Sequence, residues 1–257
     1  MKQRQKQQVK SRLYTSILLV LLALAAVTAV TVAWFSIADN TRVRTMSLDI
    51  VSDVDMRMDL DAHETIEDYV RTLSFADIDK RIQQEKGFSM QEKPLEPVTT
   101  QDTHTFTFEN GSVVESTSGA YLEFTLHFIA EKDLLVHLTS ADGQGGDGGT
   151  NISSNNPQLP EAMRISFETD GMTWIYDPGM GDAGSTSGNM KVFGLPDASN
   201  MQNNDNNLLF SLKEGEDKTV QVHIWLEGTD PACTDELRNA DYAIWLRFTG
   251  ERIENET

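Results

Sequence analysis

The sequence predicts a mainly β protein: an antiparallel β-sandwich with a small helical insertion, preceded by an N-terminal transmembrane or signal helix. Three observations lead to this fold class. Apolar and polar residues alternate in at least five segments, which is the period of half-buried strands. Glycine, asparagine and aspartate turn signals separate nine to eleven such segments. A long apolar run at residues 17–35 follows a polar, basic start.

The apolar run is long enough to cross a membrane. Its 19 residues would form a helix of about 28 Å, close to the thickness of the hydrocarbon core of a bilayer. No acidic residue precedes it, but five basic ones do: Lys2, Arg4, Lys6, Lys10 and Arg12. These charges keep that end in the cytoplasm. We therefore expect a basic stub with the signal or transmembrane helix at residues 1–36, and an exported β-sandwich domain at residues 37–257.

Two interpretations of the run remain open. As a signal peptide it would be removed during export, and small residues suited to cleavage occur at Ala25, Ala26, Ala29 and Ala33. As a permanent anchor it would keep its full length, with Trp34 at the outer membrane interface. Either way, we expect the domain at the extracellular face of the membrane or secreted to the cell surface or matrix.

The end of the run resembles a known family. Thr31-Val32-Ala33-Trp34-Phe35-Ser36, followed about ten residues later by Met46-Ser47-Leu48-Asp49-Ile50, is similar to the start of the TasA/camelysin family of Gram-positive surface and biofilm-matrix proteins. Met46 stands where that family usually has Gly, and Ile37 where Asp often follows. The resemblance implies cleavage by a dedicated signal peptidase and a jelly-roll sandwich. It also implies fibres in which the freed N-terminal segment pairs with the sheet of the next subunit.

Charge limits the partners of the exported part. After Ser36 the chain has 16 basic and 40 acidic residues, a net charge of −24. Such a surface argues against nucleic acid as a partner and makes bound cations such as Ca²⁺ plausible. Cys233 is the only cysteine, so no intramolecular disulfide can form.

Residues 46–62 alternate almost strictly and predict a long strand with an acidic outer face. We expect a bend near Ser52 and Asp53, because 17 residues are many for one strand. Weak Ca²⁺ candidates lie on the acidic face: Asp53, Asp55, Asp59 and Asp61. Alternate carboxylates on one pleated face stand about 6.6–7 Å apart, and no EF-hand glycine is present, so a solvated face is the plainer interpretation.

Residues 64–86 interrupt the β pattern. Ile66, Tyr69 and Leu73, and then Ile78 and Ile82, recur at helical spacing, which predicts one or two inserted helices lying across the sandwich. Gly87 and the prolines beyond it end them. Packing against the sheet is the plainer role, and a lid or partner-binding element the alternative.

The rest of the chain predicts strands joined by polar loops. Strands are expected at 103–108, before the turn signal Asn110-Gly111, and at 120–130, 134–138, 162–168, 172–176, 191–193, 208–212, 219–228 and 242–250. Three Gly/Asn-rich loops lie at 141–160, 178–189 and 196–207. The first loop contains the other weak Ca²⁺ candidates, Asp142 and Asp147. Trp225 and Trp245, opposite the apolar rows of the last two strands, could pair across them.

No motif for catalysis is present, and we do not expect an enzyme. The camelysin branch has been described as metallopeptidases, but His63-Glu64 lacks the second His of a zinc-binding helix. No cofactor other than weak Ca²⁺ is expected. Two functions compete. The first is a structural surface or matrix protein that assembles through its N-terminal strand. The second is a membrane-anchored binding module for glycan, peptide or Ca²⁺ that uses the three loops.

Overall fold

The computed structural model describes residues 18–20, 42–51, 56–237 and 240–253. The chain divides into two units, Met1–Asp39 and Asn40–Thr257. Of the predicted apolar helix at 17–35, only residues 18–20 are described, and these are helical. None of the described helices is long and apolar enough to cross a membrane.

The second unit is mainly β, with fifteen strands among its described residues. The first sheet has the order β13 (Leu208–Leu212), β7 (Leu134–Leu138), β15 (Asp241–Arg252), β1 (Arg42–Ile50) and β3 (Thr72–Ser74). β15 has one further partner, β8 (Asn151–Ser154). β8 pairs with Tyr242–Trp245 of β15, whereas β7 pairs with Phe248–Arg252. β1 therefore lies near one edge of this sheet, next to the C-terminal strand.

The second sheet is larger. Its central part runs β11 (Gly184–Ser187), β12 (Met190–Phe193), β10 (Met172–Tyr176), β9 (Met163–Thr169) and β14 (Lys218–Glu227). Beyond β14 follow β6 (Leu122–Ala130) and β2 (Met56–Asp59). The end of β14 also pairs with β4 (Pro97–Thr100), which pairs with β5 (Phe106–Thr107).

The expectation of a purely antiparallel sandwich is wrong, because both sheets are mixed. β1 runs parallel to β15, β12 parallel to β10, and β4 parallel to the end of β14. The first of these pairs joins the two ends of the domain. Turn signals indicate hairpins between neighbouring segments, so they carry no information about such a distant pairing.

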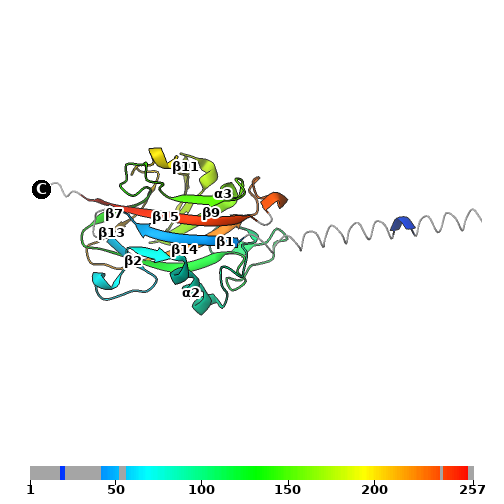
Figure 1. The fold of residues 1–257 in the computed structure, drawn as a ribbon, viewed down its shortest axis with the longest axis horizontal. Coiled ribbons are helices and arrows are strands. Elements are labelled where there is room, and N and C mark those ends of the chain that lie inside the picture. Colours follow the sequence, from blue (N-terminus) through cyan, green and yellow to red (C-terminus); the bar gives the residue numbers. More distant parts are fainter. Residues whose placement is uncertain (1–17, 21–41, 52–55, 238–239, 254–257) are drawn as a thin grey trace, which may run out of the picture. The chain divides into compact units, whose positions relative to one another are not determined.

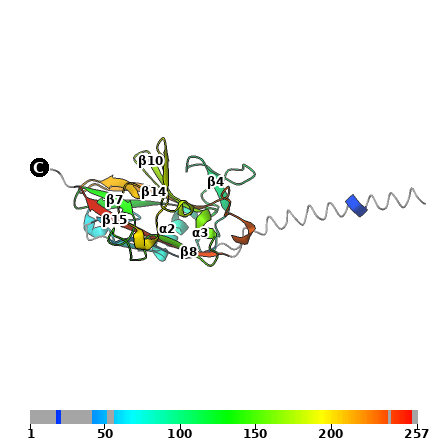
Figure 2. The same cartoon turned by 90° about the horizontal axis from the view of Figure 1, so that it is seen from above.

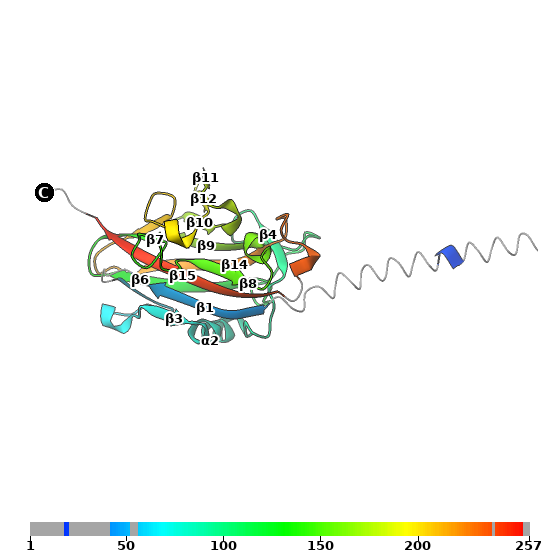
Figure 3. The ribbon, with the colours of Figure 1, turned by 45° about the horizontal axis from the view of Figure 1, so that its top comes forward.

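The two sheets face each other across one apolar core (Figures 1 and 3). Figure 2 views the layers from the edge, with β10 and β14 above β8 and β15. Phe248 of β15 contacts Phe128 of β6 and Phe167 of β9, with ring centroids 5.3 and 5.8 Å apart. The alternation predicted for residues 120–130 is confirmed, since Leu122, Phe124 and every second residue onward are buried.

A smaller apolar cluster covers the outer face of the second sheet. Trp225 of β14 is buried there against Phe106 of β5, which stacks on Tyr121. The proposed pairing of Trp225 with Trp245 is wrong, because β14 and β15 belong to different sheets. Their similar patterns of alternation gave no sign of this separation.

The predicted strand at 46–62 is in fact two strands in different sheets. The chain leaves β1 at Ile50 and enters β2 at Met56; the expected bend at Ser52 and Asp53 lies outside the described residues. The predicted helical insertion at 64–86 is confirmed only in its second half, where α2 (Phe75–Lys86) ends at Gly87 in the left-handed conformation. Its first half holds a 3-10 turn η1 (Ile66–Asp68) and strand β3, because Leu73 pairs with Leu48 of β1.

The remaining helical elements are short and lie in the loops: α3 (Leu159–Ala162), η2 (Pro178–Met180), η3 (Ala198–Asn200) and η4 (Asp235–Leu237). The turn predicted at Asn110-Gly111 is confirmed. Gly111 donates its amide to the Phe108 carbonyl at 2.8 Å, and Phe108 donates to the Ser112 carbonyl at 3.0 Å.

Candidate functional site

The first candidate site is the outer edge of β1, the strand that follows the predicted signal segment. β1 pairs with β15 through eight residue pairs, from Arg42 to Ile50. On its other side, β3 pairs only with Ser47, Leu48 and Asp49. Among the described residues, no strand pairs with Arg42–Met46 on that side, although helix α2, which continues the chain from β3, also contacts β1. Such an edge can accept an extended segment by main-chain pairing.

Two arginine side chains lie on this edge. Arg42 and Arg44 are exposed, although the Arg44 Nε donates to Asp241 Oδ2 at 2.7 Å. The register with β15 shifts between Val43 and Thr45, and such irregularities increase local twist. Val43 and Met46 point into the core and hold the strand in place.

Residues 69–74 cover the other half of the edge. Ile50 donates its amide to the Arg71 carbonyl at 2.8 Å, and Leu73 lies opposite Leu48. On the C-terminal side, Ser74 begins α2 with a capping box in which the Asp77 carboxylate accepts from the Ser74 amide at 2.9 Å. The hydrogen bonds from Ser74 lower the pKa of Asp77.

On the N-terminal side, Tyr69 anchors this segment to the second sheet. Its side chain is almost fully buried, and its hydroxyl donates to Asp217 Oδ1 at 2.7 Å. The other oxygen of Asp217 accepts from His127 Nδ1 at 2.9 Å, and the His63 amide donates to the Tyr69 hydroxyl at 3.0 Å. Burial raises the pKa of Tyr69. Sequence patterns did not reveal this network, because its members lie up to 154 positions apart in the sequence. They meet only in the folded protein.

The second candidate site is the group of three polar loops, which the structure brings together. The glycine-rich loop after β7 lies against the loop around η3: Gly146 donates to the Ala198 carbonyl at 2.7 Å, and Asn203 donates to the Gly143 carbonyl at 3.0 Å. The loop that contains β11 follows, with Gly184 beside Asn206 and the Lys191 ammonium on the Asp205 carbonyl. Figure 3 shows β11, β12 and the yellow η3 on the same side of the sandwich.

A buried histidine of β7 contacts the third of these loops. His137 of β7 is only 2% exposed, and its Nδ1 lies 3.1 Å from Asn207 Oδ1. That oxygen also accepts from the Asn204 amide at 2.9 Å, while Asn207 Nδ2 donates to the Gln202 carbonyl at 2.6 Å. These bonds fix the orientation of the Asn207 amide, so His137 must donate through Nδ1. Burial lowers the pKa of His137, while the Glu251 carboxylate, whose Oε2 lies 3.3 Å from Nε2, acts in the opposite direction.

The candidate Ca²⁺ ligands have other partners where the structure describes them. Asp59 Oδ1 accepts from the Leu60 amide at 2.6 Å, and Asp61 pairs with Arg81, whose hydrogen bond lowers the pKa of Asp61. Asp142 accepts from the Gln144 amide at 2.8 Å and Asp147 from the Gly149 amide at 3.0 Å, as turn-forming aspartates do. Asp53 and Asp55 lie outside the described residues. Among the described residues, no three His, Cys, Asp or Glu side chains are grouped as metal ligands.

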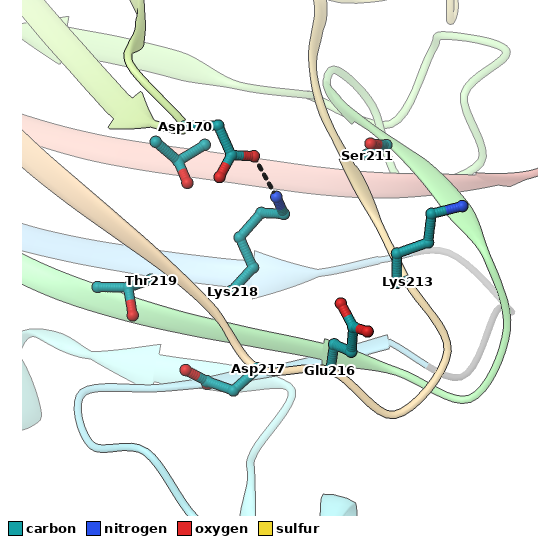
Figure 4. A pocket seen from close by; sticks show the side chains of 8 residues that line it. Asp170, Ser211, Lys213, Glu216, Asp217, Lys218 and Thr219 are labelled. Carbon is teal, nitrogen blue, oxygen red and sulfur yellow. Dashed lines mark hydrogen bonds and ion pairs between the residues drawn. The ribbon is translucent and has the colours of Figure 1, made fainter.

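A polar hollow lies where the β9–β10 turn meets the start of β14 (Figure 4). Its volume is about 410 Å³, and its lining includes Thr169, Ser211 and Glu216. The Lys218 ammonium pairs with Asp170 across it. The Lys213 Nζ lies 2.9 Å from Asp133 Oδ2. Both lysines are thus already neutralised by carboxylates, which leaves no net cationic group to attract an anion.

Among the described residues, Ser166 and His223 form a serine–histidine contact that is buried. Ser166 Oγ lies 3.4 Å from His223 Nδ1 in the second sheet, and both residues are covered by the outer cluster around Phe106 and Tyr121. Burial lowers the pKa of His223 to about 4. Because both side chains are buried, a substrate cannot reach them. We therefore assign this pair a role in packing the sheet.

Comparison with known proteins adds no assignment. No family model matches the chain, and neither a curated protein nor a solved structure matches it. Function must therefore be inferred from the residues and their arrangement alone.

Proposed function

We propose that this chain is an exported, acidic structural protein of the cell surface or extracellular matrix, which assembles into fibres through its N-terminal strand. We further propose that its sandwich is a jelly-roll variant related to the TasA/camelysin family. The unpaired edge of β1 at Arg42–Met46 is the observation that carries the proposal. It belongs to the first strand after a segment that has the length and charge pattern of an export signal.

A segment suited to that edge directly precedes β1 in the sequence. Residues 37–41 number five, as many as the unpaired residues of β1, and they contain Asp39. Signal cleavage near Ser36 would free them. Asp39 of one copy would then approach Arg42 and Arg44 of the next, so the pairing has complementary charge as well as matching length.

The high net charge opposes assembly. Copies that each carry about 24 excess negative charges repel one another until salt, cations or protonation reduce the charge. Fibre formation should therefore depend on conditions. This dependence offers a plain role for Ca²⁺ as a counterion, without a dedicated site.

Two measurements on the exported protein test the proposal. Mass spectrometry of the mature N-terminus should give a chain that starts near residue 37. Electron microscopy between about pH 4 and pH 7 should then show fibres under the more acidic conditions. A terminus at Met1 or Lys2 would instead make the domain membrane-anchored.

The group of three loops supports a second candidate, a binding module for glycan, peptide or Ca²⁺. The supporting observation is that Asn207 and its neighbours are held in one arrangement by His137 and by backbone groups, as a preformed site requires. A chain that stays monomeric under every condition but binds a glycan or peptide array would favour this function over the first.

A further inference from the structure

We propose that the peptide bond between Asp177 and Pro178 is a self-cleavage site in acid, and that Arg164 controls it through a second carboxylate, Asp230. The modification is a cut in the backbone that requires no protease. It goes beyond the proposed function, because it depends neither on export nor on assembly.

The chain contains two Asp-Pro dipeptides, and folding brings both to one arginine. Asp177-Pro178 joins β10 to η2, and Asp230-Pro231 lies in the loop after β14. Asp177 Oδ2 lies 3.0 Å from Nη2 of Arg164, and the Asp230 carboxylate pairs with the same nitrogen. The arginine side chain is largely buried. One cation is therefore shared by two carboxylates, each of which precedes a proline.

The two aspartates have the same local geometry. Asp177 Oδ1 accepts from the Gly179 amide at 2.9 Å, and the Asp177 carbonyl accepts from the Met180 amide at 3.1 Å. Asp230 makes the same two bonds with the amides two and three positions further on, at 2.8 and 2.9 Å. In each turn an N–H donates to the backbone carbonyl of the aspartate, where it stabilises negative charge that develops on that oxygen during an attack.

The reaction is an attack by the aspartate on its own backbone. One carboxyl oxygen of Asp177 bonds to the carbonyl carbon of the same residue, the bond from that carbon to the Pro178 nitrogen breaks, and the carboxyl proton leaves with the nitrogen. The products are a cyclic anhydride at Asp177 and a secondary amine at Pro178. One water molecule from the solvent then opens the anhydride to two carboxyl groups. The sum is hydrolysis of one peptide bond, and its first step is intramolecular.

The reaction requires a protonated Asp177 carboxyl, because the proline nitrogen leaves with that proton. Burial raises the pKa of Asp177; Arg164 acts in the opposite direction, and the charge of Asp230 acts with burial. At a pH above this pKa the carboxylate is ionised and paired with Arg164, so the bond is stable. As the pH falls through the pKa, the proton binds to Asp177 while Arg164 stays with Asp230. Asp177-Pro178 is therefore the bond that breaks, and Asp230-Pro231 is the protected one.

The charged groups that face Asp177 come from two elements, β9 with Arg164 and the loop after β14 with Asp230. Tyr176 precedes it in β10, and α3 contributes the Glu161 carbonyl, which accepts from Arg164 at 2.6 Å. These neighbours hold the arginine between the two carboxylates.

A cut at this bond nicks the domain without separating its parts. β10 pairs with β12 at four positions, and the Asp177 amide donates to the Phe193 carbonyl at 2.8 Å. We therefore expect the fragment that ends at Asp177 and the fragment that begins at Pro178 to stay together under native conditions and to separate in denaturant.

The second Asp-Pro bond provides a control within the same molecule. The wild-type protein, as the cell exports it, is kept at the lowest pH at which circular dichroism still shows the native fold, and a second sample is kept at the same pH in denaturing urea. Mass spectrometry of the denatured samples then quantifies the fragments from each bond. The two fragments from one cut should together exceed the intact mass by one water molecule.

We expect the Asp177-Pro178 bond to break at least about tenfold faster than the Asp230-Pro231 bond in the folded protein, and at a similar rate in urea, where the arrangement around Arg164 is lost. Equal rates for the two bonds in the folded protein would overturn the proposal. Faster cleavage of Asp177-Pro178 in urea than in the fold, or its absence from the folded sample, would do the same.

Two variants test the roles of the carboxylates. Asp177→Asn keeps the acceptor for the Gly179 amide but removes the acid, so the fragment that ends at residue 177 should not form. Asp230→Asn leaves Arg164 to Asp177 alone, which should keep that carboxylate ionised and slow its cleavage several-fold. Continued cleavage in the first variant, or an unchanged rate in the second, would overturn the proposal. The comparison of the two bonds in the wild type needs no variant, so it decides the matter even if a variant does not fold.

Discussion

Individual side chains hold the strand connections in place, and Arg164 is the clearest case. Its guanidinium lies 3.0 Å from Asp177 Oδ2 and also pairs with Asp230, and its side chain is 11% exposed. It thereby joins η2, the end of α3 and the loop after β14. Burial raises the pKa of Asp177 despite this partner.

Arg164→Met should therefore destabilise the domain by about 3–5 kcal/mol, because the buried Asp177 and the partly buried Asp230 lose their cation. Arg44→Met is the matched control. It removes an ion pair whose arginine is 63% exposed, and should cost less than about 1 kcal/mol. Urea unfolding of both variants measures the difference. A loss for Arg164→Met no larger than that of the control would contradict this account of the buried pair.

His223 makes the stability of the domain depend on pH. Its folded-state pKa of about 4 lies below the ordinary 6.5, so in this window the unfolded chain binds the proton more readily. The stabilising contribution of the neutral ring is complete above pH 6.5 and is lost as the pH falls toward 4. It amounts to about 3 kcal/mol.

His223→Leu should reduce the decline in stability between these pH values. The free energy of unfolding, measured with urea at several pH values, should fall less steeply in the variant than in the wild type. Parallel curves would show that other groups cause the acid sensitivity.

The sequence identified candidate side chains but did not show which residues they contact. Asp142 and Asp147 were noted for Ca²⁺, yet both accept backbone amides of their own loop. His137 and His223 belong to no local motif that would predict their surroundings. Their burial and their partners Asn207 and Ser166 depend on contacts between residues 57 to 70 positions apart, which no local pattern encodes.

At the scale of elements, the glycine-rich loop shows why composition alone misleads. Ala141–Asn151 has the composition of a flexible linker, but Gly145 packs so closely on the loop around η3 that an added Cβ would lie 2.9 Å from the carbonyl oxygens of Ser199 and Met201. Its φ of +91° also requires glycine. The glycines are therefore needed for close contact between two loops.

Two glycine substitutions separate these effects. Gly145→Ala should lower the stability of the loop group by at least about 1 kcal/mol more than Gly146→Ala. Both positions have positive φ, but the added Cβ at Gly146 meets nothing within 4 Å. Urea unfolding gives the stability, and limited proteolysis of the loop provides a local measure. Equal effects would mean that backbone conformation alone explains the glycine at 145.

The sequence largely predicted where strands occur, but it did not predict which strands pair with each other. Period-two alternation located β6, β14 and β15, and Gly87 correctly marked the end of α2. The helical spacing of Tyr69 and Leu73 was misleading, because Tyr69 is buried by its bond to Asp217 and Leu73 by its place opposite Leu48. Two separate tertiary contacts thus bury residues four positions apart, which is also the spacing of a helix.

At the scale of the whole molecule, the net charge opposes the proposed assembly, whereas the strand topology favours it. The parallel pairing of β1 with β15 brings the N-terminal strand into a sheet and leaves part of its edge unpaired. The charge of −24 after Ser36 keeps copies apart.

Screening should therefore control assembly. Raising the salt from about 0.1 M to about 1 M shortens the Debye length from about 10 Å to about 3 Å, and should accelerate fibre growth measured by light scattering. Lowering the pH toward 4 should act in the same direction by protonating carboxylates. Slower growth at high salt would indicate that specific ion pairs, such as one between Asp39 and the arginines of β1, outweigh general repulsion.

The most direct test of assembly through the N-terminal strand compares two mature chains, one that begins at residue 37 and one that begins at residue 42. Light scattering and electron microscopy follow both under the same acidic, high-salt conditions, and circular dichroism checks that both retain the same β fold. We predict fibres from the longer chain and soluble monomers from the shorter one, because in the proposed assembly residues 37–41 supply the pairing segment. Equal fibre formation by the two chains, or none by either, would contradict the account.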